Sequence, residues 1–159
     1  MLKQYVLLAA VAICLYGCAS VPMGDTNKDA ALKTFAVKPD VASVYIYRNG
    51  LLDGPNLRMN VQVDGKPLGQ TVPKVYLYTE ISPEKHVITS TTVNLWTGNP
   101  VDDSDNLELE AVAGKRYYIW QEWKSGFLVA HVKLHLVDES EGQKVVLENK
   151  LAVKLADPQ

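Results

Sequence analysis

The sequence predicts a mainly β domain: an antiparallel β-sandwich, immunoglobulin-like or prealbumin-like, with a short helix near its C-terminal end. Short runs rich in β-branched and aromatic residues recur along the chain, and turn pairs such as Asn49-Gly50 and Asp64-Gly65 separate them. Several runs alternate apolar and polar residues, which is typical of strands with one buried face. The length of 159 residues suits one such domain and an export segment.

Seven runs are expected to form the strands of the sandwich. In one of them, Met59, Val61 and Val63 alternate with polar residues, so one face should be buried. Pro83 ends another run, because proline cannot donate to a strand ladder. The expected strands cover residues 41–47, 59–63, 75–78, 86–93, 107–111, 116–123 and 127–137.

The only helical pattern lies at the end of the domain. Ser140 is a candidate N-cap, with Glu141 in the first turn and Val145 and Val146 following. Before the domain, residues 18–38 are small and polar without a sustained period, which predicts a flexible tether. That tether would hold a domain spanning residues 39–156 away from a membrane.

Residues 1–17 have the pattern of a signal peptide. Lys3 supplies a positive charge, and the 12 residues from Tyr5 to Tyr16 are uncharged and mostly apolar. A membrane-spanning helix needs about 20 apolar residues, whereas a signal peptide needs roughly 7–15. The run ends in Leu15-Tyr16-Gly17-Cys18, which resembles the lipobox of bacterial lipoproteins.

The lipobox resemblance implies cleavage between Gly17 and Cys18 and acylation of Cys18. Membrane lipid would then be a partner of the protein through Cys18, because two or three acyl chains anchor a protein durably. The resemblance also implies the outer membrane, facing the periplasm, since Ala19 stands where an aspartate favours inner-membrane retention. The alternative is an ordinary signal peptide with a cysteine there by chance.

Cysteine content and charge narrow the class of protein further. The two cysteines are Cys14 and Cys18, so a processed chain would keep one and form no internal disulfide. Its stability must then come from a hydrophobic core. The formal net charge is −2, with no basic face, so no nucleic-acid partner is expected.

Several segments of the domain carry a family resemblance. They are Val44–Arg48, Val61–Gly65 with Leu68-Gly69, Tyr76–Tyr78, Pro83 with His86, and Gly114–Tyr118. Together they span about residues 40–150 and resemble bacterial lipoproteins that carry the domain of unknown function numbered 2846. The resemblance implies an envelope location and a β fold, and it brings no known catalytic residue.

Two groups of potential metal ligands are interpreted as surface residues. His131 and His135 lie on a predicted strand, where residues four apart are about 13 Å apart and cannot bind one ion together. Asp102, Asp103 and Asp105 are expected in a solvated acidic loop, because the glycine and glutamate of an EF-hand loop are missing. No metal, cofactor or catalytic residue is therefore predicted.

Aromatic residues are the remaining candidates for ligand contact. Large side chains occupy both faces of the strands that hold Tyr45, Tyr47, Tyr118, Trp120 and Trp123, so several rings could lie outside the core. The alternative is a second covered layer, or rings packed under the C-terminal helix. The sequence thus favours a non-enzymatic envelope lipoprotein that binds or supports another envelope protein. A module that binds peptidoglycan or lipopolysaccharide through exposed rings is the alternative.

Overall fold

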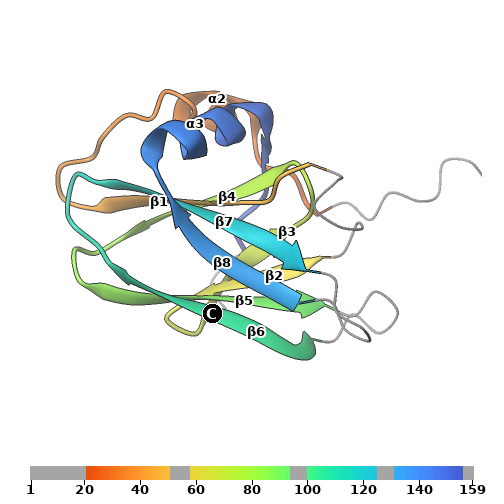
Figure 1. Cartoon of the computed structure of the whole chain (residues 1–159). Helices are drawn as coiled ribbons and strands as arrows, with labels where there is room; N and C mark the ends of the chain where they lie inside the picture. Colours follow the sequence, from red (N-terminus) through yellow and green to blue (C-terminus); the bar gives the residue numbers. More distant parts are fainter. Residues whose placement is uncertain (1–20, 51–57, 94–99, 125–130, 156–159) are drawn as a thin grey trace, which may run out of the picture.

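The structure is a computed structural model that describes residues 21–50, 58–93, 100–124 and 131–155. The predicted signal peptide, Gly17 and Cys18 lie outside these residues. Two β-sheets stack face to face, and two helices cover the outer face of one of them (Figure 1). The predicted mainly β sandwich with a C-terminal helix is confirmed.

The first sheet has the strand order β8-β7-β1-β4-β9, and the second has the order β3-β2-β5-β6. The strands are β1 (Ala42–Tyr47), β2 (Met59–Val63), β3 (Lys66–Thr71), β4 (Val75–Ile81), β5 (Lys85–Val93), β6 (Pro100–Glu110), β7 (Arg116–Lys124), β8 (His131–Val137) and β9 (Lys150–Leu151). The helices are α2 (Thr26–Leu32) and α3 (Glu139–Glu148).

The first sheet is mixed, so the prediction of a wholly antiparallel sandwich is wrong for it. β1 pairs antiparallel with β4 but parallel with β7, and β9 pairs parallel with β4. Parallel neighbours need a long crossover, and here the strands of the second sheet lie between β1 and β7 in the chain. The second sheet is antiparallel throughout its described strands.

The hairpin of β2 and β3 contains a strand that the sequence did not predict. Asp64 and Gly65 form its two-residue turn with φ of 52° and 75°, the positive values that a type I′ turn requires. The predicted turn is therefore confirmed. β3 escaped prediction because Pro67 and Gly69 are poor strand formers, which an edge strand tolerates.

Helix α3 confirms the predicted C-terminal helix but begins at a different cap. The Asp138 carboxylate accepts the Glu141 backbone N–H at 3.0 Å, so Asp138, and not Ser140, caps the helix. Gly142 lies directly over the Tyr118 ring. A Cβ at position 142 would lie 2.2 Å from Tyr118 Cγ, so the glycine permits the close approach of helix and sheet.

The N-terminal segment differs from the predicted flexible tether. From Val21, which is buried, the chain packs on the domain, and residues 26–32 form α2. Asp25 caps this helix by accepting the N–H groups of Asn27 and Lys28, each at 2.9 Å. The folded domain thus extends back at least to residue 21, whereas the sequence placed its start at residue 39.

A buried polar bridge crosses the largely apolar interior between the two sheets. The Gln121 side chain of β7 donates to Ser90 Oγ of β5 and accepts from Thr71 Oγ1 of β3, both at 2.7 Å. All three side chains are buried. Since each polar group is satisfied only in this alignment, the bridge fixes how the two sheets lie on each other. The surrounding core includes Val44, Ile46, Val61, Leu77, Ile88, Leu109, Ile119 and Leu134.

Candidate functional site

The aromatic residues proposed as ligand contacts form a covered second core. Tyr45, Tyr47 and Tyr118 are each only 1% exposed, so the prediction that they contact a ligand is wrong for these three rings. They lie on the outer face of the first sheet, where they pack with Leu32 of α2 and Val146 of α3. Trp120 is half-buried beside them and stacks on His135 at 5.0 Å. The structure therefore contains the covered layer that the sequence left as the alternative.

These tyrosines hold the N-terminal segment on the sheet. Tyr45 stacks on Tyr118 with ring centroids 5.1 Å apart, and Phe35 packs edge-on against both rings. The Tyr45 hydroxyl donates to the Leu32 carbonyl at 3.0 Å. Burial raises the pKa of Tyr45 well above its usual range, and nearby tyrosines add to the rise. The hydroxyl therefore stays a neutral donor, as docking of α2 requires.

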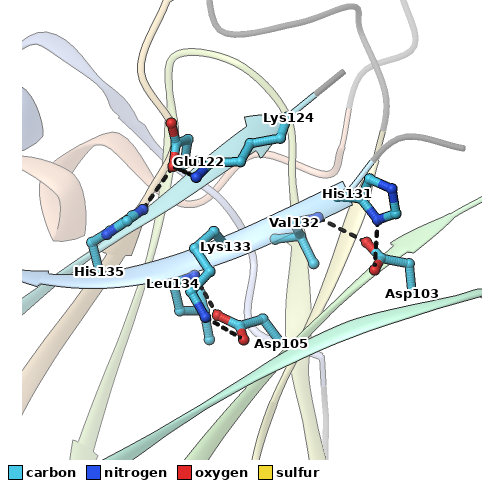
Figure 2. Close-up of polar contacts among 9 residues, drawn as sticks. All are labelled: Asp103, Asp105, Glu122, Lys124, His131, Val132, Lys133, Leu134 and His135. Atoms are coloured by element: carbon cyan, nitrogen blue, oxygen red, sulfur yellow. Dashed lines mark hydrogen bonds and ion pairs between the residues drawn. The ribbon is translucent and has the colours of Figure 1, made fainter. Parts of the chain in front are cut away.

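The acidic cluster is a strand-to-strand bridge. Asp103 and Asp105 lie in β6, and their carboxylates accept the backbone N–H groups of Val132 and Leu134 in β8, both at 2.8 Å (Figure 2). The two carboxylates are only about one-fifth exposed. The prediction of a solvated acidic loop is wrong for them, because β6 begins at Pro100, earlier than the alternation indicated. Asp102 also lies in β6.

The bridge of Asp103 and Asp105 protects the β8 edge of the first sheet. β8 and β6 are edge strands, and unpaired N–H groups on such an edge invite pairing with another chain. Burial alone would raise the pKa of Asp105, but the hydrogen bond from the Leu134 N–H and the ion pair with Lys133 lower it overall. The Asp105 carboxylate therefore stays charged and keeps the Leu134 N–H of β8 occupied.

His131 and His135 have separate carboxylate partners. His131 Nδ1 lies 3.0 Å from Asp103 Oδ1, and His135 Nε2 lies 2.8 Å from Glu122 Oε2 (Figure 2). Both rings lie on the solvent side of β8, as the sequence predicted. Among the described residues, no group of three or more side chains is placed to hold a metal ion.

A cluster of aspartate, histidine and serine was not visible in the sequence. His86 Nδ1 donates to Asp64 Oδ2 at 2.6 Å, and His86 Nε2 donates to the Ser82 carbonyl at 3.0 Å. The other Asp64 oxygen accepts the Val87 N–H at 2.8 Å. This Asp64–His86 clamp, named for its two side chains, joins the β2–β3 turn to the β4–β5 turn.

The electrostatics of the Asp64–His86 clamp favour a charged pair. Burial lowers the pKa of His86, but the hydrogen bonds to Asp64 and to the Ser82 carbonyl outweigh it and raise the pKa overall. The hydrogen bond from His86 lowers the pKa of Asp64, and the Val87 N–H adds to that effect. Because both acceptors can only accept, both ring nitrogens carry protons.

The geometry of the cluster differs from that of a hydrolase triad. A general base needs a free ring nitrogen within reach of the nucleophile. Here Nε2 donates to a carbonyl, and Ser82 Oγ lies 3.4 Å from it while donating to Glu84. A groove of about 380 Å³ opens beside the clamp, and charges of both signs line it, including Lys66, Glu80 and Lys154. Such a lining suits a polar ligand or partner segment.

Sequence reasoning missed the Asp64–His86 clamp because its members lie 22 residues apart in the chain. The signal that could have found it is the family resemblance, since both Asp64-Gly65 and Pro83 with His86 belong to the segments that carry it. The motifs alone, however, do not show that these two segments meet, because the fold is needed to bring Asp64 and His86 within hydrogen-bond distance.

The fold and these features define a class: a small two-sheet sandwich with a helical cover on one sheet. Residues 38–134 match the model of a family described as a protein of unknown function (DUF2846), and the chain belongs to this family. It is also similar to an uncharacterized protein of Haemophilus influenzae, 31% identical over 147 residues, which covers 92% of this chain and 82% of that protein. No solved structure matches the chain.

Proposed function

We propose that this protein is a lipid-anchored envelope protein whose sandwich domain acts in binding or structural support without catalysis. The observation that carries the proposal is the sequence Leu15-Tyr16-Gly17-Cys18 directly before a folded domain. A lipobox needs its cysteine at the new N-terminus, and here Val21, the first of the described residues and a buried one, follows three positions later. Within the described residues, no helix is long and apolar enough to span a membrane.

The Asp64–His86 clamp supports the non-catalytic part of the proposal. Its imidazole is protonated on both nitrogens and is held between two turns, so it acts as a link between them. The groove beside it is the surface that we assign to an envelope partner, because its mixed charges are accessible and suit polar recognition.

Acylation is tested by expressing the full chain in a Gram-negative host with a labelled fatty acid. The protein should take up label and fractionate with the outer membrane. The Cys18→Ala variant should lose the label, while Cys14→Ala should keep it, because residue 14 lies in the removed segment. Equal labelling of both variants, or labelling of neither, would contradict the anchor.

The absence of catalysis is tested on the same purified protein with ester and peptide substrates. We expect no turnover above that of buffer. Turnover that disappears in both Ser82→Ala and His86→Gln, but not in His131→Gln, would show that the cluster is a catalytic site and would overturn the proposal.

A further inference from the structure

One edge of the sandwich is built from both ends of the domain. Residues 21–24 lie beside residues 150–155, with Gly24 N donating to the Leu151 carbonyl and Val153 N donating to the Pro22 carbonyl, both at 2.8 Å. Leu155 N then donates to the Leu68 carbonyl of β3 at 2.9 Å. The paired segments therefore run from β9 in the first sheet to β3 in the second, at the edge opposite β6 and β8.

The position of Val21 limits how far this edge can lie from an acylated Cys18. Three residues, even fully extended, span at most about 11 Å. The headgroup region of a bilayer leaflet is itself about 5–8 Å thick. A domain whose fold includes Val21 thus cannot be held clear of the membrane, and some part of this edge must meet the headgroups.

The surface of this edge has the composition of a membrane contact. Met23, Val153 and Leu155 are 43%, 43% and 47% exposed, although large apolar side chains are usually covered. Lys66 and Lys154 line the neighbouring groove together with the carboxylates of Asp64, Glu80 and Glu84. Within the part of the chain that the structure describes, no ion pair holds either lysine. Exposed apolar side chains beside lysines that lie outside ion pairs suit the interface of an anionic bilayer.

The opposite edge differs in character. There the carboxylates of Asp103 and Asp105 cover the N–H groups of β8, and His131 and Lys133 pair with them (Figure 2). Because these carboxylates and cations are already paired with one another, they have little charge left to attract anionic headgroups, so this edge is suited to face away from the lipid.

We propose that the edge formed by residues 21–24 and 150–155, the terminal edge, rests on the headgroups of an anionic membrane, with the β6–β8 edge pointing away. The inference rests on the proposed acylation of Cys18 and goes beyond it by fixing the orientation of the domain. The domain would then contact the bilayer through its terminal edge and would not hang from a flexible tether.

The orientation can be measured on the full, processed chain with single spin labels. Removal of Cys14 with the signal peptide and acylation of Cys18 leave no free thiol, so one introduced cysteine takes the label. Val153→Cys reports on the terminal edge, and His131→Cys is the matched control on the opposite edge. Both proteins are reconstituted in phosphatidylethanolamine–phosphatidylglycerol vesicles that contain a nickel-chelating lipid.

We expect the nickel headgroups to relax the label at position 153 several-fold more strongly than the label at position 131. Equal relaxation in protein that floats with the vesicles would overturn the orientation and leave the anchor intact. Protein that does not float would overturn the anchor and the orientation together. In phosphatidylcholine vesicles the difference in relaxation between the two labels should shrink. An unchanged difference would show that the lysines do not contribute to the membrane contact.

Discussion

The Asp29 carboxylate accepts a hydrogen bond from the Tyr76 hydroxyl at 2.7 Å, and this contact fastens α2 to β4. The same Asp29 oxygen accepts the Leu151 backbone N–H at 3.1 Å, and the second oxygen pairs with Lys33. One carboxylate therefore joins the N-terminal segment, the sheet and the C-terminal strand. This explains why a segment with little apolar character is folded onto the domain.

Tyr76→Phe should lower the free energy of unfolding by about 1.5–3 kcal/mol, because a hydrogen bond to a charged group is lost in a buried place. Tyr117→Phe is the matched control. Its hydroxyl contacts only backbone groups of Glu110 and Val112, so its removal should cost about 0.5–1.5 kcal/mol. Urea unfolding measures both, and an equal or smaller loss in Tyr76→Phe would argue against the role of Asp29.

Gly142→Ala should destabilise the protein although alanine is the better helix former. Helix propensity alone would add up to about 1 kcal/mol of stability. The new Cβ would lie within 2.2 Å of Tyr118 Cγ, however, and overpacking of this kind costs about 1–3 kcal/mol. Lys144→Ala, on the exposed side of α3, should change stability by less than about 0.5 kcal/mol. A stabilised Gly142→Ala protein would contradict the packing.

The paired substitution of Asp103→Ala and Asp105→Ala should open the β8 edge. Amide exchange at Val132 and Leu134 should accelerate, because their N–H groups lose their acceptors. The protein should also aggregate more readily, as light scattering would show. Glu108→Ala, an exposed position in β6, is the control and should leave both measurements unchanged. Unchanged exchange in the double variant would count against the bridge.

The Asp64–His86 clamp predicts a specific dependence of stability on pH. The pKa of His86 is raised in the folded state, so its contribution is fully present below the unfolded value of about 6.5 and is lost as the pH rises through the folded value. The pKa of Asp64 is lowered, so its contribution is present above about 3.9 and is lost as the pH falls through the folded value.

Thermal unfolding across pH 3–9 tests the clamp in the native chain and in His86→Gln. The native chain should gain stability from the clamp between the two folded pKa values, and the variant should lose that gain. His131→Gln serves as the control, since its ring lies at the surface of β8. A His86→Gln profile parallel to that of the native chain would show that the histidine carries no charge in the fold.

Most strands could be predicted from the sequence because alternation reports a buried face directly. Val61 and Val63 carry that signal in β2, whereas Pro67 and Gly69 hide it in β3. Helix α2 could not be predicted. It has seven residues and no buried side chain, so it lacks the apolar periodicity of a longer helix. Its stability depends on its cap and on tyrosines from distant strands.

The candidate sites could not be predicted fully, because they are formed by contacts between residues that lie far apart in the sequence. Tyr45 and Tyr118 could be recognised as candidates for a second layer, but which chain segment covers them follows from the position of Phe35. The carboxylate of Asp105 looked solvated because its partner, the Leu134 N–H, lies 29 residues away. The solvent-facing position of His131 and His135 in β8 could be predicted, because it depends only on alternation within one strand.

Mass spectrometry of the intact protein, purified from membranes in detergent, measures the N-terminal residue and its modification together. We expect a chain that begins at Cys18 and carries a diacylglyceryl group and an amide-linked fatty acid. A chain that begins at any other residue, or one that begins at Cys18 without acyl mass, would contradict the lipid anchor and the membrane-seated domain that depends on it.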